Sequence, residues 1–233
     1  MMNECGPCTW FVTMSPGEWM WPELGDYIKE VDGLTNDKRS ISALVAADPV
    51  AATIFIHNRF DAVMEYLLSP DHPIGEISHF YWVCEYQGRG LPHFHCLFWI
   101  KNAPVYGVNS NEEVQEFITK HITCEIPNKT VSPELHDQIL MFQSHKCNSY
   151  CMRTRTTKSG SKSACRFGFP RPVTKDFVFR DVDESIANRR KLKNRSKFYD
   201  LPRNDSQKYI NDWMPAVAIV WKGKTDAQFI SEK

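Results

Sequence analysis

Residues 90–99 read GLPHFHCLFW, an apolar run that two histidines interrupt one residue apart. In a β-strand successive side chains point to opposite faces, so His93 and His95 share one face and the apolar residues around them share the other. Residues 77–87 form a second run rich in β-forming residues, and the turn-forming sequence GRGL joins the two. This pattern predicts an antiparallel hairpin that carries both imidazoles on one face.

The first strand of this predicted hairpin brings a third polar group to the histidines. Glu85 and Gln87 share one face of that strand, so either can lie beside His93 and His95 across the turn. A carboxylate with two imidazoles can hold a divalent metal and leave positions open for water or a phosphate oxygen. The spacing H-x-H also occurs in structural and surface pairs, so spacing alone leaves a metal site and a structural pair as alternatives.

Composition limits the class of protein. The 233-residue chain is 42% hydrophobic and 12% aromatic, which can supply a core and argues against wholesale disorder. No stretch approaches the roughly 18 apolar residues of a membrane helix, and the N-terminus lacks the pattern of a secretory signal. We therefore expect a soluble, intracellular chain with no membrane partner. In that setting the 8 cysteines favour thiol or metal chemistry over a disulfide scaffold.

The remaining segments indicate a mixed α and β chain. Residues 9–14 predict a short strand that feeds a helix capped by Ser15, and Asp48 is expected to begin a longer helix. Two further helices are expected after Ser110 and Ser132, each with its serine as N-cap. The apolar stripe expected on the long helix consists of Val50, Ile54, Phe60, Val63, Met64 and Leu67.

Charge is distributed unevenly although the formal net charge is +0. Residues 146–203 contain 16 Lys and Arg against 5 Asp and Glu, and the densest part is RRKLKNRSK at residues 189–197. This segment predicts either a solvated helix face or a phosphate-binding surface. Its candidate DNA-binding residues are Arg189, Arg190, Lys191, Lys193, Arg195 and Lys197.

A second constellation of possible ligands lies in HKCNSYC and CRFGFP. His145, Cys147, Cys151 and Cys165 offer four nitrogen and sulfur ligands, and a basic loop separates the last from the first three. A closed tetrahedral zinc site fits this set, with Cys124 as a possible substitute for His145. The alternative is that these cysteines are reduced and inert, which is the description we expect for the strand cysteines.

The residues around the two histidines resemble a known family. EYQGRGLPHFHCLFWI looks like the hallmark segment of the Helitron helicase-like N-terminal domain, the Rep-type HUH endonuclease of Helitron rolling-circle transposons. Further segments resemble the family in TWFVTMSPGEWMWPEL, DPVAATIFIHNRF, CRFGFPRP and LPRNDSQKYINDWMPAVAIVWKGKTDAQFI. The resemblance implies an α+β, HUH/Rep-like antiparallel sheet with packed helices, followed by a C-terminal basic zinc-binding extension.

The resemblance also implies a chemistry. Glu85, His93 and His95 would hold Mg2+ or Mn2+, with Gln87 as the competing third ligand. The ion would polarise the scissile phosphate of single-stranded DNA, and a tyrosine would attack phosphorus to form a 5′-phosphotyrosyl intermediate. The released 3′-hydroxyl can prime rolling-circle synthesis. The family implies a helicase domain as partner in the full-length protein and a nuclear location in a eukaryotic host.

The chain departs from the family at the nucleophile. The paired tyrosines are expected on a helix of Y-x-x-K-Y character beyond the segment matched by DAQFISEK, and therefore beyond Lys233. Tyr199 and Tyr209 lie before that segment, and neither is followed by the expected lysine pattern. We expect a metal-dependent DNA nickase and strand transferase only in the full-length protein. The alternative is a truncated or domesticated module that binds DNA without catalysis.

These expectations divide the chain into three segments. Residues 1–142 are expected to form the HUH/Rep-like nuclease core, and residues 143–175 the Cys/His zinc-binding segment. Residues 176–233 are expected to contain the basic DNA-contacting segment and the C-terminal part of the Helitron-like domain, truncated before the tyrosine helix.

Overall fold

The computed structural model describes residues 5–34, 36–87, 90–157, 160–180 and 198–232. The chain divides into two compact units, one of Met1–Val108 with Trp213–Lys233 and the other of Asn109–Asp212. These bounds do not coincide with the expected segment boundaries after residues 142 and 175, and the functional roles given to those segments stay predictions.

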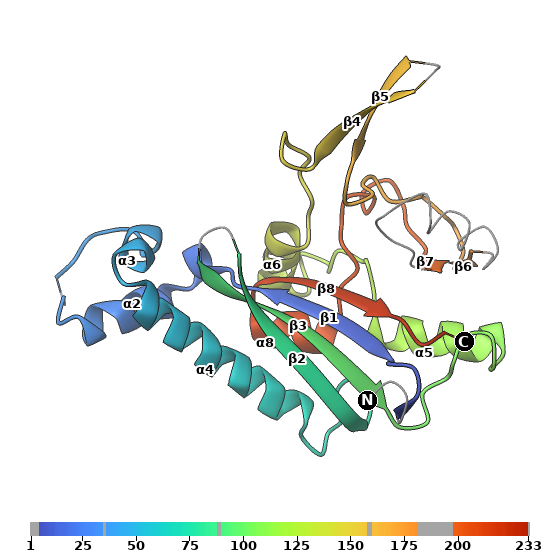
Figure 1. The fold of residues 1–233 in the computed structure, drawn as a ribbon, viewed down its shortest axis with the longest axis horizontal. Coiled ribbons are helices and arrows are strands. Elements are labelled where there is room, and N and C mark those ends of the chain that lie inside the picture. Colours follow the sequence, from blue (N-terminus) through green and yellow to red (C-terminus); the bar gives the residue numbers. More distant parts are fainter. Residues whose placement is uncertain (1–4, 35, 88–89, 158–159, 181–197, 233) are drawn as a thin grey trace. The chain divides into compact units, whose positions relative to one another are not determined.

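The first unit is built on a four-stranded antiparallel sheet (Figure 1). Its order is β2-β3-β1-β8, so the strand from the start of the chain lies beside the one from its end. The predicted hairpin is confirmed, with Glu85 opposite His93 and Val83 opposite His95. The four strands are β1 (Trp10–Ser15), β2 (Ile77–Gln87), β3 (Leu91–Ile100) and β8 (Lys224–Phe229).

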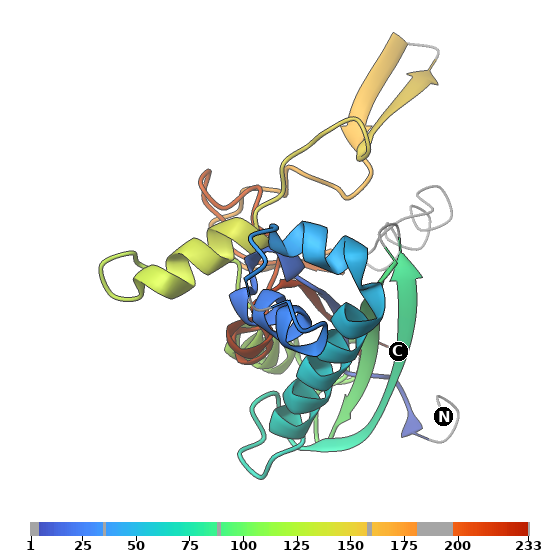
Figure 2. The same ribbon diagram turned by 90° about the vertical axis from the view of Figure 1, so that its left-hand side faces the viewer.

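The alternation of side chains gives this sheet one apolar face. Eight residues on it are 0% exposed, and they are Trp10, Val12, Met14, Phe94, Cys96, Phe98, Ala227 and Phe229. Phe60 of the long helix α4 (Pro49–Leu67) stacks on Phe94 with 3.9 Å between ring centroids. Trp221 of α8 (Pro215–Trp221) meets Phe94 edge-on at 6.1 Å. The core of the first unit therefore lies between the sheet and these two helices, which lie on the same side of the sheet (Figure 2).

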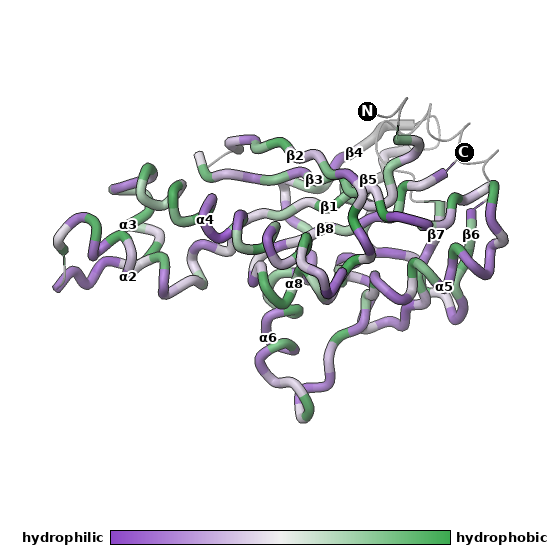
Figure 3. The backbone as a smooth tube through the Cα atoms, turned by 90° about the horizontal axis from the view of Figure 1, so that it is seen from below, coloured by the Kyte–Doolittle hydropathy of each residue, from purple (hydrophilic) through white to green (hydrophobic). Residues whose placement is uncertain are grey.

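The helices of this unit confirm some local predictions and correct others. Asp48 is the N-cap of α4, since its carboxylate accepts hydrogen bonds from the N–H groups of Val50 and Ala51. The expected stripe on α4 is wrong at its start, because Val50 and Ile54 are 67% and 47% exposed. Its later members Phe60, Val63, Met64 and Leu67 are buried. Along α4 the hydropathy varies from residue to residue (Figure 3).

The helix predicted to begin at Ser15 is wrong. β1 continues through Ser15, which pairs with Lys224 in β8 and accepts a hydrogen bond on its carbonyl from the Trp221 indole. Sheet pairing on both sides of β1 outweighs the local capping preference. A 3-10 helix, η1 (Glu18–Met20), follows instead, and α2 (Pro22–Val31) and α3 (Ile41–Ala47) complete the unit.

The second unit has α5 (Asn111–His121), α6 (Pro133–Phe142), and two small ribbons. Ser110 caps α5 as predicted and forms a capping box with Glu113. Ser132 is the N-cap position of α6 as predicted, but its side chain makes no capping hydrogen bond. The ribbons are β4 (Met152–Thr157) with β5 (Gly160–Cys165), and β6 (Val178–Phe179) with β7 (Tyr199–Asp200).

A buried ion pair holds the segment after β7. The Arg203 guanidinium donates to the carboxylate of Asp212 and to the carbonyls of Gln207 at 3.0 Å and Ile210 at 2.8 Å. Both side chains of the ion pair are at most 5% exposed. Because the arginine is satisfied inside the protein, it stabilises the second unit and does not offer a surface charge.

None of the described helices is by itself long and apolar enough to cross a bilayer. α3 and α4 meet that criterion only when taken together, and they are bent by 111° at the break between them.

The position of the core predicts a large loss of stability for one aromatic residue of the hairpin and almost none for another. Phe94→Ala should lower the free energy of unfolding by about 3–5 kcal/mol, because it removes a buried ring that four aromatic side chains contact. Tyr81→Ala should change it by no more than about 0.5 kcal/mol, because Tyr81 is 50% exposed. Urea unfolding followed by tryptophan fluorescence measures both, and equal losses would contradict this placement of the core.

Candidate functional site

The second face of the four-stranded sheet, here called the polar face, brings the predicted acidic and histidine residues together. His93 and His95 alternate with buried Phe94 along β3, so both rings lie on this face with centroids 4.6 Å apart. The Glu85 carboxylate comes from β2, and its Oε2 lies 3.6 Å from Nε2 of His95. The three side chains therefore lie close together on a partly exposed region of the polar face.

Two hydroxyl groups of β1 hold the histidine rings. Thr13 Oγ1 lies 3.1 Å from Nδ1 of His95, and Ser15 Oγ lies 2.8 Å from Nδ1 of His93. A metal-binding histidine commonly has its second nitrogen engaged in this way, which fixes the ring and leaves the other nitrogen for the ion. Thr13 and Ser15 are not among the site residues predicted from the sequence, although T-x-S at strand spacing places two hydroxyls on one face.

Strand β8 adds two charged residues to the polar face. Lys224 lies opposite Ser15 and Asp226 opposite Thr13. Burial and the neighbouring His95 lower the pKa of His93, Glu85 acts in the opposite direction, and Lys224 lowers it further. The lowered pKa favours the neutral form of His93, which is the form that can ligate a metal.

The competing third ligand is not placed by the structure. Gln87 pairs through its backbone with Leu91 at the end of the hairpin, but its side chain lies outside the described part of the chain. Glu85 is the group that the described structure brings to the histidines.

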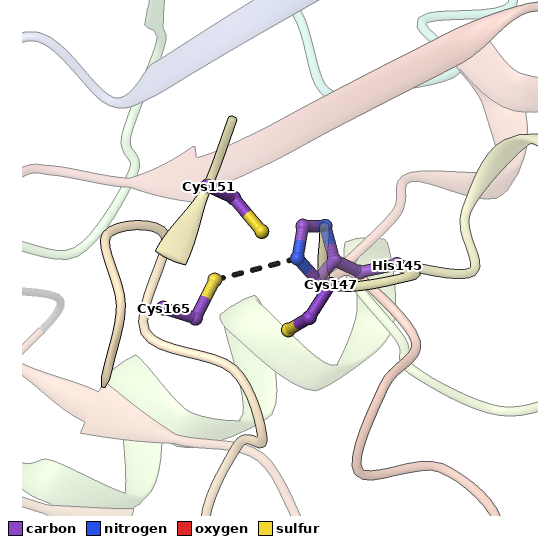
Figure 4. A group of neighbouring side chains, drawn as sticks. All are labelled: His145, Cys147, Cys151 and Cys165. Atoms are coloured by element: carbon purple, nitrogen blue, oxygen red, sulfur yellow. Dashed lines mark hydrogen bonds between the residues drawn. The ribbon is translucent and has the colours of Figure 1, made fainter. Parts of the chain in front are cut away.

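The second constellation forms one cluster in the second unit. His145, Cys147, Cys151 and Cys165 each offer one ligand atom, and these atoms all lie within 4.8 Å of one another (Figure 4). Nε2 of His145 is 3.3 Å from Sγ of Cys165. These four side chains could hold a metal ion such as zinc. The suggested substitute, Cys124, lies elsewhere and donates its thiol to the carbonyl of Pro202.

Aromatic rings and backbone N–H groups hold this cluster in place. The His145 ring stacks on Phe169 at 4.4 Å between centroids, and the Arg171 guanidinium lies over the same phenylalanine at 4.5 Å. The N–H of Asn148 donates to Sγ of Cys151 at 3.2 Å. Hydrogen bonds of this kind to ligand atoms and apolar rings around them orient a metal site and restrict its access to water.

The thiols of the cluster differ electrostatically from the isolated cysteines. Burial alone would raise the pKa of Cys165, but the N–H groups of Phe169 and Phe167 and the other two thiols lower it below the usual value. Partial loss of hydration and the neighbouring thiols of Cys165 and Cys151 raise the pKa of Cys147 to about 11. A lowered pKa favours the thiolate of Cys165, and thiolates are the form of cysteine that zinc binds.

Two cysteines outside the cluster, Cys96 and Cys8, have raised pKa values. Burial raises the pKa of Cys96 to about 12 and that of Cys8, in the N-terminal CGPC sequence, to about 11. A redox-active thiol needs a lowered pKa, so this direction argues against thioredoxin-type chemistry at Cys8.

The two described candidate tyrosines differ in exposure and belong to another unit than the histidine pair. Tyr199 is 1% exposed and stacks on Phe177, so it belongs to a core, while Tyr209 is 37% exposed. Both belong to the second unit, whereas Glu85, His93 and His95 belong to the first. The predicted DNA-binding residues at positions 189–197 lie outside the described residues.

Comparison with known families gives a match in the first unit. Residues 1–98 match the family described as the Helitron helicase-like domain at the N-terminus. The matched range includes β1, helices α2 to α4 and both histidines of β3. The resemblance inferred from the sequence is therefore confirmed for this part of the chain. No curated protein matches the chain.

The Cys/His cluster predicts a bound metal in the purified protein. Elemental analysis should find about one zinc per chain, and Cys151→Ala or Cys165→Ala should abolish it together with the ordered fold around β4 and β5. Cys124→Ala is the matched control, because it removes a buried thiol of the same unit that is not in the cluster. Metal-free protein with an unchanged fold would leave these residues as ordinary thiols.

Proposed function

On the premise that residues 1–98 form a Helitron helicase-like domain, we propose that the chain supplies the metal-binding part of a Rep-type HUH endonuclease acting on single-stranded DNA. One observation carries the proposal. Glu85, His93 and His95 lie close together on a partly exposed sheet face, and a hydroxyl of β1 lies within hydrogen-bond distance of Nδ1 of each histidine. Metal-binding histidines commonly have their second ring nitrogen engaged in this way, and this supports the proposal.

The donor set fits Mg2+ or Mn2+. It combines imidazole nitrogens with a carboxylate oxygen, contains no thiolate, and lies on a partly open face that leaves room for water and a phosphate oxygen. When bound, such an ion would polarise the scissile phosphate and stabilise the charge that develops on it. Glu85, His93 and His95 would hold the ion, and Lys224 would attract a phosphate oxygen at the edge of the site.

The nucleophile is proposed to come from outside residues 1–233, as the family resemblance implies. The burial of Tyr199 supports this, because an attacking phenol oxygen must reach phosphorus in line with the leaving group. Attack forms a tyrosine–phosphorus bond and breaks the bond from phosphorus to the 3′ oxygen, which leaves as the free 3′-hydroxyl. That hydroxyl primes rolling-circle synthesis, with a helicase domain of the full-length protein separating the strands, in the nucleus of a eukaryotic host.

The Cys/His cluster is proposed to hold a structural Zn2+. Three thiols and one imidazole give the closed tetrahedral ligand set of a structural site, with no position left for substrate. The ion would therefore stabilise the second unit and take no part in DNA cleavage.

A DNA-binding module without catalysis is the second candidate function. The burial of Tyr199 in a core, which removes it as a nucleophile, favours this alternative as far as residues 1–233 are concerned. The two candidates differ in whether a longer chain with the Y-x-x-K-Y helix can cleave DNA.

The polar face predicts metal binding that depends on the histidines and on their hydroxyl partners. In isothermal titration with Mn2+, His93→Ala with His95→Ala should abolish the site. Ser15→Ala should weaken binding by about 10–100-fold, because His93 loses the contact that orients its ring. Ser78→Ala is the control, since its hydroxyl donates to the carbonyl of Trp99. Unchanged Mn2+ affinity in the double variant would remove the nuclease assignment.

Cleavage should require the tyrosine helix as well as the metal site. Residues 1–233 should bind labelled single-stranded DNA with Mn2+ present but form no covalent adduct, whereas the chain extended through the tyrosine helix should give a DNA-linked protein band on a denaturing gel. The extended chain with His93→Ala and His95→Ala serves as the inactive control. A metal-dependent adduct from residues 1–233 would direct attention to Tyr209 and Tyr199, and an inactive extended chain would favour the binding module.

A further inference from the structure

A row of apolar side chains lies beside the histidine pair on the polar face. The register pairs Tyr81 of β2 with Leu97 of β3, and Leu97 in turn with Phe11 of β1. Because side chains alternate along a strand, these three lie on the same face as His95, which is two residues from Leu97. Tyr81, Leu97 and Phe11 are here called the apolar row, and their strands are neighbours in the sheet (Figure 1).

The apolar row adjoins the candidate metal site. The Phe11 ring stacks on the His95 ring, with 5.7 Å between the centroids and 5° between the planes. Two residues of a strand span roughly 6.5 Å, so the row is separated from the pair of Val83 and His95 by about that length along the strands. When a nucleotide has its phosphate at the metal site, the row is therefore within reach of a neighbouring base.

The outer end of the apolar row is open to solvent. Tyr81 is 50% exposed and Val83, next to it on the same face, is 37% exposed, whereas Phe11 and Leu97 are half-buried. The core of this unit lies on the opposite face of the sheet, so the Tyr81 ring contributes little to stability. A single exposed aromatic residue is ordinary, but contiguous apolar side chains beside a polar site indicate a binding surface.

We propose that the apolar row is a base-stacking subsite for single-stranded DNA, in which Tyr81 stacks on a base next to the phosphate at the metal site. Proteins that bind single strands combine cations for the phosphates with aromatic rings for the bases, and stacking tolerates any sequence because every base has a π-face. The polar face has both groups, with Lys224 on β8 and Tyr81 on β2. The inference rests on the DNA partner of the proposed function and adds a residue that holds a base.

The position of Tyr81 on an edge strand allows a second occupant. β2 is at the edge of the sheet, and an edge strand can pair with a strand of another protein. Such pairing uses the backbone of β2 and involves side chains of both faces, whereas base stacking needs only the face that carries the histidines. Tyr81 lies on that face, which favours DNA.

The test compares three substitutions of exposed tyrosines on β2. Tyr81→Ala removes the ring, and Tyr81→Phe keeps the ring but removes its hydroxyl. Tyr86→Ala is the matched control, because Tyr86 is 59% exposed on the same strand but follows Glu85 and so lies on the opposite face. Urea unfolding should show nearly wild-type stability for all three variants, because both tyrosines are exposed.

Binding of a short oligodeoxythymidine is then measured without added Mn2+. Tyr81→Ala should bind about 5–150-fold more weakly than wild type, which corresponds to the loss of one stacked base, while Tyr81→Phe and Tyr86→Ala should stay within about twofold. Equal affinity of Tyr81→Ala and wild type would overturn the proposal. An equal loss in Tyr86→Ala would overturn it as well and would assign the edge of β2 to strand pairing.

A strand of the same length without bases separates stacking from backbone contacts. This abasic strand keeps its phosphates, so wild type and Tyr81→Ala should bind it with equal affinity. If Tyr81→Ala weakens binding of the abasic strand as much as that of oligodeoxythymidine, the residue contacts the backbone and the base-stacking proposal fails.

Titration with Mn2+ distinguishes the subsite from the nuclease proposal. Tyr81→Ala should keep the wild-type Mn2+ affinity, and a loss would overturn its role as a base contact. If His93→Ala with His95→Ala leaves Mn2+ binding unchanged while the effect of Tyr81→Ala on DNA persists, the nuclease proposal fails and the subsite stands. If the histidines bind Mn2+ but Tyr81→Ala binds single strands like wild type, the subsite alone fails.

Discussion

The antiparallel pairing of β1 with β3 is the constraint on which the first unit depends. Its register places Thr13 opposite His95 and Met14 opposite Phe94. Because side chains alternate, this one register sends Met14 and Phe94 into the core and both histidines to the polar face. A shift by one residue would bury two imidazoles and expose a phenylalanine. The core beneath the sheet therefore enforces the geometry of the candidate site above it.

The two candidate metal centres differ in how far they enclose an ion. The cluster of the second unit brings three thiols and an imidazole together at the base of the ribbon of β4 and β5. The polar face instead places its donors on a sheet whose stability comes from the opposite side, so the donors can remain partly exposed. A structural ion must be enclosed, whereas a site that acts on phosphate needs open positions.

Much of this could be predicted where local sequence and tertiary packing agree. The hairpin follows from alternation around GRGL, and Asp48 and Ser110 cap their helices because their side chains need only neighbouring N–H groups. Predictions failed where distant residues decide. Ser15 has good capping chemistry, but its pairing with Lys224, far along the chain, keeps it in a strand. Val50 fits the apolar period of α4 but lies where nothing covers it enough to bury it.

The other residues of the polar face could not be predicted because they lie far from the histidines in sequence. Glu85 and the histidines are neighbours along the chain, and so their association is visible in a single hairpin. Thr13 and Ser15 join them only through β1, and Lys224 and Asp226 only through β8. β8 lies beyond the range of the family match, which ends at Phe98. An edge strand from outside that range therefore completes the sheet. This strand also brings the positive charge of Lys224 close to His93. If the polar face acts on a phosphate, its charge balance is a property of the folded unit and not of the histidine motif alone.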